Sequence, residues 1–261
     1  MIDKERHERI LTHLRKRRFV TVRELTSLLS SSEATIRRDL LHLENTGEIQ
    51  RHWGGASLTA STQKRFHPPV LPESSLENRL GKLSEIKRLI AQKAVSLINA
   101  GETIIIDGGS STYFMTEFLE DQELKIITNS FAIAAHLIDN SQNTIIIPGG
   151  IVYPESRIVL NPFDSSFFND YTPSKLFMSV AGLSENGATN SDTTLIRLEK
   201  RMIASANELI VLCDSSKLMK RDSLFLCDLE SIDTLITDRG ISAPFRSTLA
   251  KAGVRVLVVE G

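Results

Sequence analysis

The N-terminal fold is decided by one stretch of sequence, SEATIRRDLLHLENTG at residues 32–47. Ser32 is of the type that caps helix N-termini, and Gly47 is of the type that ends helices, so the two residues bound a predicted helix. Three apolar residues between them recur at the helical spacing i, i+4 and i+7: Ile36, Leu40 and Leu43. The pattern predicts an amphipathic helix that packs on one face and leaves the other face free for a partner.

Two more helices are predicted before this one, and a hairpin is predicted after it. The first helix begins near Lys4 and carries apolar residues at helical spacing: Ile10, Leu11 and Leu14. The second begins at a capping box of Thr21 and Glu24 and has its own apolar residues: Val22, Leu25, Leu28 and Leu29. Gly54 and Gly55 can turn a short hairpin. Short helices with short connections, followed by a hairpin, predict a winged helix-turn-helix over residues 1–57.

The polar face of the third helix has the residues that DNA recognition needs. At about 100° per residue, Ala34 and Arg38 lie opposite the apolar face, and Thr35 and Arg37 flank them. Small residues let a helix approach base edges, and guanidinium groups bind phosphate or guanine. The alternative is that the two arginines only solvate a helix surface. The residues predicted to contact DNA are Thr21, Ser32, Ala34, Thr35, Arg37, Arg38, Arg51 and His52.

Two residues near this surface are predicted to have structural roles. Asp39 lies nearer the apolar face than the DNA-facing side, so we expect it to pair with an arginine and orient it. Trp53, between the wing residues and the Gly-Gly turn, is expected to pack at the base of the wing rather than stack on a base.

The spacing S-x-x-T-I-R-R-D-L-x-x-L-E-x-x-G, followed by R-H-x-G-G-A, resembles the signature of the DeoR family of bacterial sugar-metabolism repressors. The resemblance runs from Ser32 to Ala56 and implies that the arginine-bearing helix reads DNA. It makes the solvated-surface alternative a minor one. Trp53 departs from the pattern, since the family often has no aromatic residue there.

Charge is distributed unevenly along the chain. Residues 1–56 carry 11 Lys and Arg against 8 Asp and Glu, a net charge of +3, whereas the remainder has a net charge of −4. The N-terminal part therefore suits a phosphate backbone better. The charged N-terminus and the lack of an apolar run near the ~20 residues that span a bilayer predict a soluble cytoplasmic protein. Cys213 and Cys227 lack partners at metal spacing, so we expect buried thiols and neither a metal nor a cofactor.

The rest of the chain reads as a linker and an α/β domain. Residues 58–76 are rich in Ser, Thr and Pro and have no apolar period, which is typical of a linker. A helix is predicted at about residues 83–99. Short β-branched runs then alternate with helical stretches at 103–106, 125–128, 144–147, 209–213, 234–237 and 254–259. Continuous apolar runs predict strands buried on both faces, hence a parallel-rich sheet flanked by helices over residues 77–261.

Polar turns follow several of these predicted strands. The run TIIIDGGSST at 103–112 places two glycines and three hydroxyls between a strand and a helix start, where backbone N–H groups can hold a phosphate. An ordinary strand–turn–helix with a Ser N-cap explains the run equally well. Ligands gather at the carboxyl ends of parallel strands, so several polar ends favour a shared pocket. The predicted effector-binding residues are Asp107, Gly108, Gly109, Ser110, Ser111, Thr112, Thr128, Asn129, Gly149, Gly150, Gly182, Asp214 and Lys217.

The resemblance to the DeoR family continues over about residues 77–240. The stretches DGGSST, TNS, GG, EKRM and DSSK resemble the DeoR-type sensor domain, which is similar in fold to ribose-5-phosphate isomerase. In those isomerases D-G-A-D-E and K-G-G-G stretches supply catalytic groups, whereas residues 181–185 here read AGLSE. The difference implies binding without turnover. HLIDNSQNTIIIPGG and FMSVAGLSENG also resemble the branch of the family that represses L-ascorbate utilisation, whose ligand would be a phosphorylated ascorbate.

The leading hypothesis is a DNA-binding repressor of a carbohydrate or sugar-acid utilisation operon, gated by a phosphorylated sugar-like effector and without enzymatic activity. Gating requires that the two arrangements of the protein bind the effector with different affinity. One alternative is a sugar-phosphate isomerase with an added DNA-binding domain, and another is a helix-turn-helix used only for protein contacts. The expected partners are double-stranded operator DNA, the effector, and further copies of the chain in a dimer or tetramer.

Overall fold

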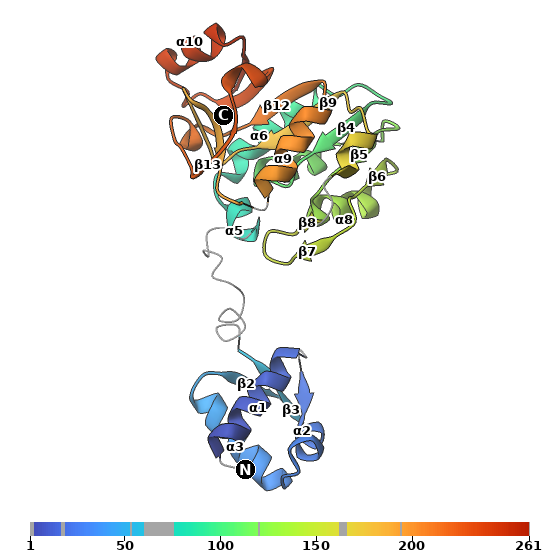
Figure 1. Cartoon of the computed structure of the whole chain (residues 1–261), viewed down its shortest axis with the longest axis vertical. Coiled ribbons are helices and arrows are strands. Elements are labelled where there is room, and N and C mark those ends of the chain that lie inside the picture. The colour runs from blue at the N-terminus through green and yellow to red at the C-terminus, as the bar shows by residue number, and fades with distance from the viewer. Residues whose placement is uncertain are drawn as a thin grey trace. The chain divides into compact units, whose positions relative to one another are not determined.

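The computed structural model describes residues 3–16, 19–52, 54–59, 76–119, 121–161, 166–193 and 195–260. The chain forms two compact units, residues 1–71 and residues 72–261 (Figure 1). Residues 60–75, which make up most of the predicted linker, lie outside the described residues, and so does Trp53.

The N-terminal unit combines three helices with a small sheet. Its elements are α1 (Asp3–Lys16), β1 (Val20–Thr21), α2 (Val22–Leu29), α3 (Glu33–Asn45), β2 (Ile49–His52) and β3 (Gly55–Leu58). The strands pair antiparallel in the order β1-β3-β2, so β2 and β3 form the predicted hairpin. This arrangement confirms the winged helix-turn-helix.

The apolar faces of the three helices meet in one core, as their spacing predicts. The core includes Ile10, Leu14, Val22, Leu25, Leu29, Ile36, Leu40, Leu43 and Ile49. Leu28 was predicted to belong to the apolar face of α2, and that prediction is wrong, because its side chain is 49% exposed. The buried stripe runs along Val22, Leu25 and Leu29, and Leu28 lies beside it.

Side-chain caps begin α2 and α3 where the sequence predicts them. The N–H of Glu24 donates to Thr21 Oγ1 at 3.2 Å, and the N–H of Thr21 donates to Glu24 Oε2 at 2.8 Å. Ser32 Oγ accepts a hydrogen bond from the N–H of Thr35 at 3.2 Å. Gly47 has a φ of +76°, the left-handed conformation that ends helices. The start of α3 and the turn that follows it are thus set by local sequence.

The C-terminal unit is built on a parallel sheet in the order β15-β14-β12-β9-β4-β5-β6. Its strands are β4 (Thr103–Ile106), β5 (Lys125–Ile127), β6 (Thr144–Ile146), β9 (Lys175–Ser179), β12 (Glu208–Leu212), β14 (Thr234–Asp238) and β15 (Arg255–Val259). Every strand except β9 coincides with a predicted apolar run. The central strand β9 was not predicted, because its sequence KLFMS has no β-branched residue and only a short apolar run.

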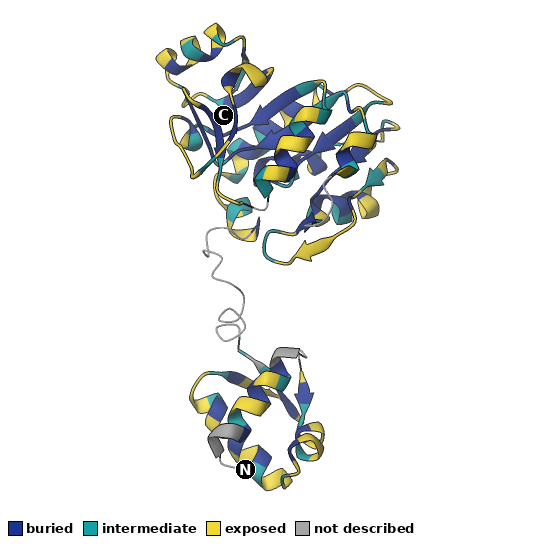
Figure 2. Cartoon of the chain, in the orientation of Figure 1, coloured by how far each residue is buried: buried dark blue, intermediate teal, exposed yellow. Residues whose placement is uncertain are grey.

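Helices cover both faces of this sheet. They are α5 (Leu76–Gly81), α6 (Ser84–Val95), α7 (Ser110–Tyr113), α8 (Phe131–Asn140), α9 (Leu195–Ser205) and α10 (Ala243–Lys251). Along β4, Ile104 and Ile106 join a core with α6 and α8, and Ile105 joins the opposite core with α9 and α10. Figure 2 shows the strands as a buried layer between helices with exposed outer faces. The predicted two-faced burial is confirmed.

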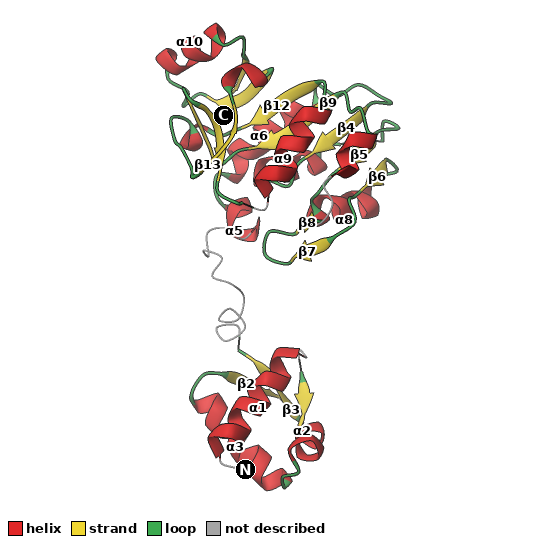
Figure 3. Ribbon diagram, viewed as in Figure 1, coloured by secondary structure: helices red, strands yellow, loops and turns green. Residues whose placement is uncertain are grey.

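Two groups of short strands lie outside the predicted pattern (Figure 3). Strands β10 (Gly182–Ser184), β11 (Gly187–Asn190) and β13 (Leu224–Cys227) form an antiparallel sheet. Strands β7 (Ile151–Tyr153) and β8 (Ile158–Leu160) form a hairpin. These strands have three or four residues each, too few for a periodic signal. No helix within the described residues is long and apolar enough to span a membrane.

Candidate functional site

Helix α3 presents its predicted DNA-facing side to solvent. Ala34, Arg37 and Arg38 are exposed, and Thr35 is half-buried beside its cap. Arg37 forms an i,i+4 ion pair with Glu33 at 3.5 Å, in which both side chains are more than half exposed. Such an exposed pair contributes little, so Arg37 can exchange Glu33 for a phosphate or a base. The helix therefore offers two guanidinium groups to a nucleic acid.

Asp39 lies on the buried side of α3 and connects this helix to α1. It is only 4% exposed. Arg6 donates to it from Nε at 2.5 Å and from a terminal nitrogen at 2.8 Å, and His7 Nε2 lies 3.0 Å from Oδ1. Burial opposes ionisation, but the hydrogen bonds from Arg6 and His7 hold the pKa of Asp39 below its ordinary value. The prediction of an arginine partner is confirmed, and that arginine comes from α1 rather than from α3.

The wing places its two predicted contact residues on the surface. Arg51 and His52 are exposed on β2. Arg51 pairs with Glu44 at 3.5 Å, and His52 Nε2 lies 2.8 Å from Ser57 Oγ across the hairpin. Glu44 thus connects α3 to the wing, since it also accepts a hydrogen bond from the N–H of Arg51 at 3.2 Å.

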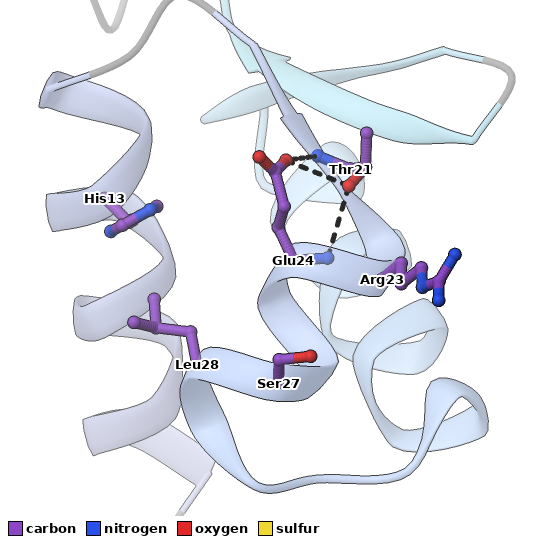
Figure 4. A pocket seen from close by; sticks show the side chains of 6 residues that line it. All are labelled: His13, Thr21, Arg23, Glu24, Ser27 and Leu28. Carbon is purple, nitrogen blue, oxygen red and sulfur yellow. Dashed lines mark hydrogen bonds between the residues drawn. The ribbon is translucent and has the colours of Figure 1, made fainter.

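Thr21 has a structural role at the start of α2. Its hydroxyl donates to Glu24 Oε2 at 2.9 Å besides capping the helix (Figure 4). The same region forms an open hollow between α1 and α2, lined by His13, Thr21, Arg23, Glu24, Ser27 and Leu28. The capping box accounts for Thr21 without DNA, so its DNA contact stays a prediction.

In the C-terminal unit, the parallel strands bring several predicted residues together at their carboxyl ends. Asp107, directly after β4, is 3% exposed and accepts a hydrogen bond from Asn129 Nδ2, after β5, at 3.2 Å. It also accepts one from the N–H of Ser179, at the end of β9. Burial raises the pKa of Asp107, opposed by the hydrogen bonds from Gly108 and Asn129. Three neighbouring strands therefore contribute to one buried polar centre.

The glycine loop after β4 differs from the expected phosphate cradle. The N–H of Gly108 donates to Asn129 Oδ1 at 2.9 Å, and the N–H of Gly109 donates to Thr112 Oγ1 at 2.8 Å. Both amides are therefore engaged within the protein. Helix α7 is a single turn of four residues, so the expected support from a long helix dipole is also missing. A phosphate contact by Gly108 or Gly109 stays a prediction that needs a rearranged loop.

Close packing explains why these positions are glycines. A Cβ on Gly108 would lie 1.9 Å from Ile158 Cδ1, and a Cβ on Gly109 would lie 2.3 Å from Ser179 Oγ. Gly150 and Gly182 are restricted in the same way, by backbone oxygens of Leu160 and Lys220 at 2.3 and 2.6 Å. Gly149 is exposed in the turn after β6, with space around it. Packing alone accounts for most of these glycines.

Other predicted residues shape the loops around the centre. Thr112 Oγ1 donates to Asp107 O at 2.6 Å, and Thr128 Oγ1 accepts from the N–H of Ser130 at 3.0 Å. Asp214 caps a short 3-10 turn, Ser215–Lys217, by accepting from the N–H of Ser216. Lys217 is half-buried, and its Nζ donates to Val180 O at 2.8 Å, one residue beyond β9. Ser110 and Ser111 are buried at the start of α7.

The structure adds charged residues that sequence reasoning missed. Lys87 of α6 is 3% exposed and donates to Arg79 O, and burial followed by the charge of Lys217 lowers its pKa to about 8. Arg79 of α5 lies near enough to Asp107 for their charges to interact. Glu199 of α9 is 1% exposed, and burial and the charge of Asp107 raise its pKa. A signal existed, because Lys87 and Glu199 lie at buried helical positions three residues before Ile90 and Met202.

Seven buried side-chain atoms have no hydrogen-bond partner among the described residues, and four of them belong to residues at or near this centre: Arg79 Nε, Ser111 Oγ, Ser179 Oγ and Glu199 Oε2. Buried polar atoms in native proteins are nearly always paired, so such a group points to a missing partner. We use the name sensor cluster for Arg79, Lys87, Asp107, Ser111, Ser179, Glu199 and Lys217. It combines three cationic side chains, two carboxyls and two free hydroxyls, which suits an anionic, hydroxyl-bearing ligand.

The cysteines do not contribute to this chemistry. Both are buried, and burial raises the pKa of Cys213 to about 12 and that of Cys227 to about 11. Both therefore remain protonated thiols, as predicted from their apolar surroundings.

Comparisons with known proteins cover both units. Residues 6–62 match the DeoR-like helix-turn-helix domain, and residues 82–239 match the DeoR C-terminal sensor domain. The HTH-type transcriptional regulator UlaR of Escherichia coli (strain SMS-3-5 / SECEC) is 30% identical over 259 residues, covering 99% of this chain and 100% of that protein. The uncharacterized HTH-type transcriptional regulator YulB of Bacillus subtilis (strain 168) is 30% identical over 260 residues, covering 99% and 98%.

Among solved structures, ribose 5 phosphate isomerase A from Neisseria gonorrhoeae is similar over 52% of this chain and 54% of its own, with 18% identity and a TM-score of 0.38. That similarity is too weak to bear on activity. The two domain matches occur in one chain, and the two regulators match it from end to end. The protein therefore belongs to the DeoR family of helix-turn-helix transcriptional regulators.

Proposed function

We propose that the protein is a repressor of a carbohydrate or sugar-acid utilisation operon, and that a phosphorylated sugar or sugar acid bound at the sensor cluster sets its affinity for operator DNA. The observation that carries the proposal is the set of buried, unpartnered polar atoms beside three cations. A phosphate would neutralise Lys87, Lys217 and Arg79, and ligand hydroxyls would pair with the serines and carboxyls. The sequence resemblance to the ascorbate branch makes a phosphorylated ascorbate one member of this class.

The proposed DNA surface is the exposed face of α3 together with the wing. A single helix-turn-helix makes few phosphate contacts, so we infer that the protein acts in the cytoplasm as a dimer or tetramer that reads two half-sites. Effector binding would change the spacing between the DNA-binding domains of two subunits, each of which contacts one half-site. Such a change is possible only if the effector binds the two arrangements with different affinity.

A thermal-shift screen of phosphorylated sugars and sugar acids tests the sensor side of the proposal. A compound present at 100 times its Kd stabilises the folded protein by about 2.7 kcal/mol. The compound that gives the largest shift is then titrated into a protein–operator mixture. The proposal fails if no compound of this class stabilises the protein, or if the stabilising compound leaves operator affinity unchanged.

A second candidate function is a sugar-phosphate isomerase with an added DNA-binding domain. The raised pKa values of Asp107 and Glu199 favour it, because buried carboxyls of this kind can act as general bases. The missing D-G-A-D-E and K-G-G-G stretches argue against it. Incubation with pentose phosphates followed by NMR separates the two functions, and we expect no conversion.

A further inference from the structure

Glu199 is a buried carboxyl with one oxygen that is available to a ligand. Its Oε1 accepts a hydrogen bond from Asn190 Nδ2 at 2.6 Å, and its Oε2 has no partner among the described residues. The charges that act on it most strongly come from Asp107 and Asp192, which are both negative. A buried carboxylate without a cation is costly, so the group is stable there when it is protonated or when it receives a hydrogen bond.

The fold places Glu199 at the edge of the sensor cluster rather than among the cations. Asn190 ends β11, whose neighbour Thr189 accepts a hydrogen bond from the N–H of Ala181, two residues beyond Ser179. Ser179 in turn donates its N–H to Asp107. The hydroxyl of Ser179 has no partner among the described residues and lies against the loop after β4, since a Cβ on Gly109 would come within 2.3 Å of its Oγ. The charge of Asp107, in the same loop, acts on Glu199.

The opposite side of the cluster is cationic. Arg79 Nε has no partner among the described residues, and Lys87 donates to the backbone oxygen of Arg79. The charge of Lys217 lowers the pKa of Lys87 and that of Asp214 raises it, so the two ammonium groups lie near each other and near Asp214. A ligand that fills the cluster therefore needs an anionic end for these cations and a neutral, hydrogen-bonding end for Glu199.

We propose that Glu199, held in place by Asn190, is a specificity-determining residue that binds a hydroxyl group of the effector, while Arg79, Lys87 and Lys217 bind its anionic group. This inference rests on the proposed function, since it names how the same site selects its ligand. A carboxyl that is protonated offers one donor and one acceptor to a hydroxyl. A site built around such a pair rejects analogues that lack the hydroxyl, because its buried polar atom is then left unpaired.

The test measures Kd by calorimetry on the full chain with three probes: inorganic phosphate, ribose 5-phosphate and ribonate 5-phosphate. In the wild type, we expect at least one of the two hydroxylated probes to bind at least tenfold more tightly than inorganic phosphate. Glu199→Met should abolish that advantage and leave the Kd for inorganic phosphate within about twofold. Glu199→Gln keeps an acceptor for Asn190 and supplies a donor, so it should retain most of the advantage.

Two further variants keep the test decisive. Asn190→Ala leaves the carboxyl of Glu199 in place but removes the hydrogen bond that holds it. We expect this variant to lose part of the tenfold advantage, and it replaces Glu199→Met in the test if that variant does not fold. Glu208→Met is the matched control, because Glu208 is the first residue of β12 and therefore lies at the amino-terminal ends of the parallel strands, opposite the carboxyl ends that carry the cluster, so it should change neither Kd. The inference is overturned if Glu199→Met keeps the tenfold advantage, if Glu199→Gln behaves like Glu199→Met, or if wild type binds phosphate as tightly as both sugar probes. Absence of binding of all three probes, together with no stabilisation by any compound of the thermal-shift screen, would instead refute the proposed function itself.

Discussion

Replacement of Asp39 by Asn should loosen the recognition helix, and the structure gives the size of the effect. The change removes the charge that Arg6 contacts through two nitrogens and leaves Arg6, a residue that is only 7% exposed, without a counter-charge. Removal of one partner from a buried ion pair costs about 3–5 kcal/mol. Asp39 lies just beneath the surface, so we expect the lower end, about 3 kcal/mol. In a domain of this size, that loss lowers Tm by about 12–24 °C.

The assay is thermal unfolding of the full chain followed by circular dichroism, with hydrogen exchange to locate the change in α1 and α3. Arg6→Met combined with Asp39→Leu is the matched control, because an apolar pair of similar volume removes both charges and should recover most of the stability. The reasoning is refuted if Asp39→Asn shifts the transition of the N-terminal unit by less than about 3 °C, or if exchange speeds up only in the sensor unit.

The Arg6–Asp39 pair also predicts that the N-terminal unit loses stability at low pH. The folded-state pKa of Asp39 lies below its unfolded value, so the stabilisation is fully present above about pH 4 and is lost as the pH falls through the folded-state pKa. In wild type, Tm of this unit should therefore fall below about pH 4 more steeply than in the apolar double variant. Parallel pH profiles of the two proteins would contradict this.

The remaining predictions concern DNA contact, loop packing and assembly. Arg38→Ala should weaken operator binding by about 1–3 kcal/mol if Arg38 reads a base, or reduce the salt slope by about one unit if it binds phosphate, as measured by fluorescence anisotropy at several salt concentrations. Gly109→Val should destabilise the C-terminal unit by about 1–3 kcal/mol, measured as a lower Tm, because its Cβ would lie 2.3 Å from Ser179 Oγ. Sedimentation should show at least a dimer at micromolar concentration.

The Arg38→Ala measurement has a matched control, and each of the three predictions has an outcome that would contradict it. Arg239→Ala removes an exposed arginine of the sensor unit that pairs with Glu260, and it should leave operator affinity unchanged. Operator affinity that is equal in Arg38→Ala and wild type at all salt concentrations would remove α3 from the interface. A Gly109→Val protein with wild-type Tm would show that Ser179 moves freely. A monomer bound tightly to a single half-site would contradict the assembly prediction.

The N-terminal fold was predictable because its signals are local. Ser32, Thr21 and Gly47 fix helix ends through atoms a few residues away, and the apolar period of α3 is complete within one helix. The central strand β9 gives no such signal. Its position between β4 and β12 is set by tertiary pairing, which overrides the weak strand preference of KLFMS.

The sensor cluster was only half predictable for a related reason. Asp107, Ser111 and Lys217 follow strands, and parallel strands bring their carboxyl ends to one edge. The cluster also contains residues from three helices: Arg79, Lys87 and Glu199. How these helices pack on the sheet could not be predicted from the sequence. The sequence signal for these residues is that a charged side chain occupies a helical position that faces the core. The loop amides of Gly108 and Gly109 were assigned to a ligand because sequence cannot show that Asn129 and Thr112 already bind them.

The central claim is that a ligand at the sensor cluster controls operator binding, and Lys217→Ala tests it most directly. A fluorescent duplex selected from a random library is bound by wild type or Lys217→Ala, and the best stabilising phosphorylated compound is titrated in. We predict equal DNA affinity without the compound, within about twofold, and a response in Lys217→Ala that is lost or moved to at least tenfold higher concentration. A response at the wild-type concentration would place the effector site elsewhere, and loss of DNA binding without the compound would make Lys217 a structural residue.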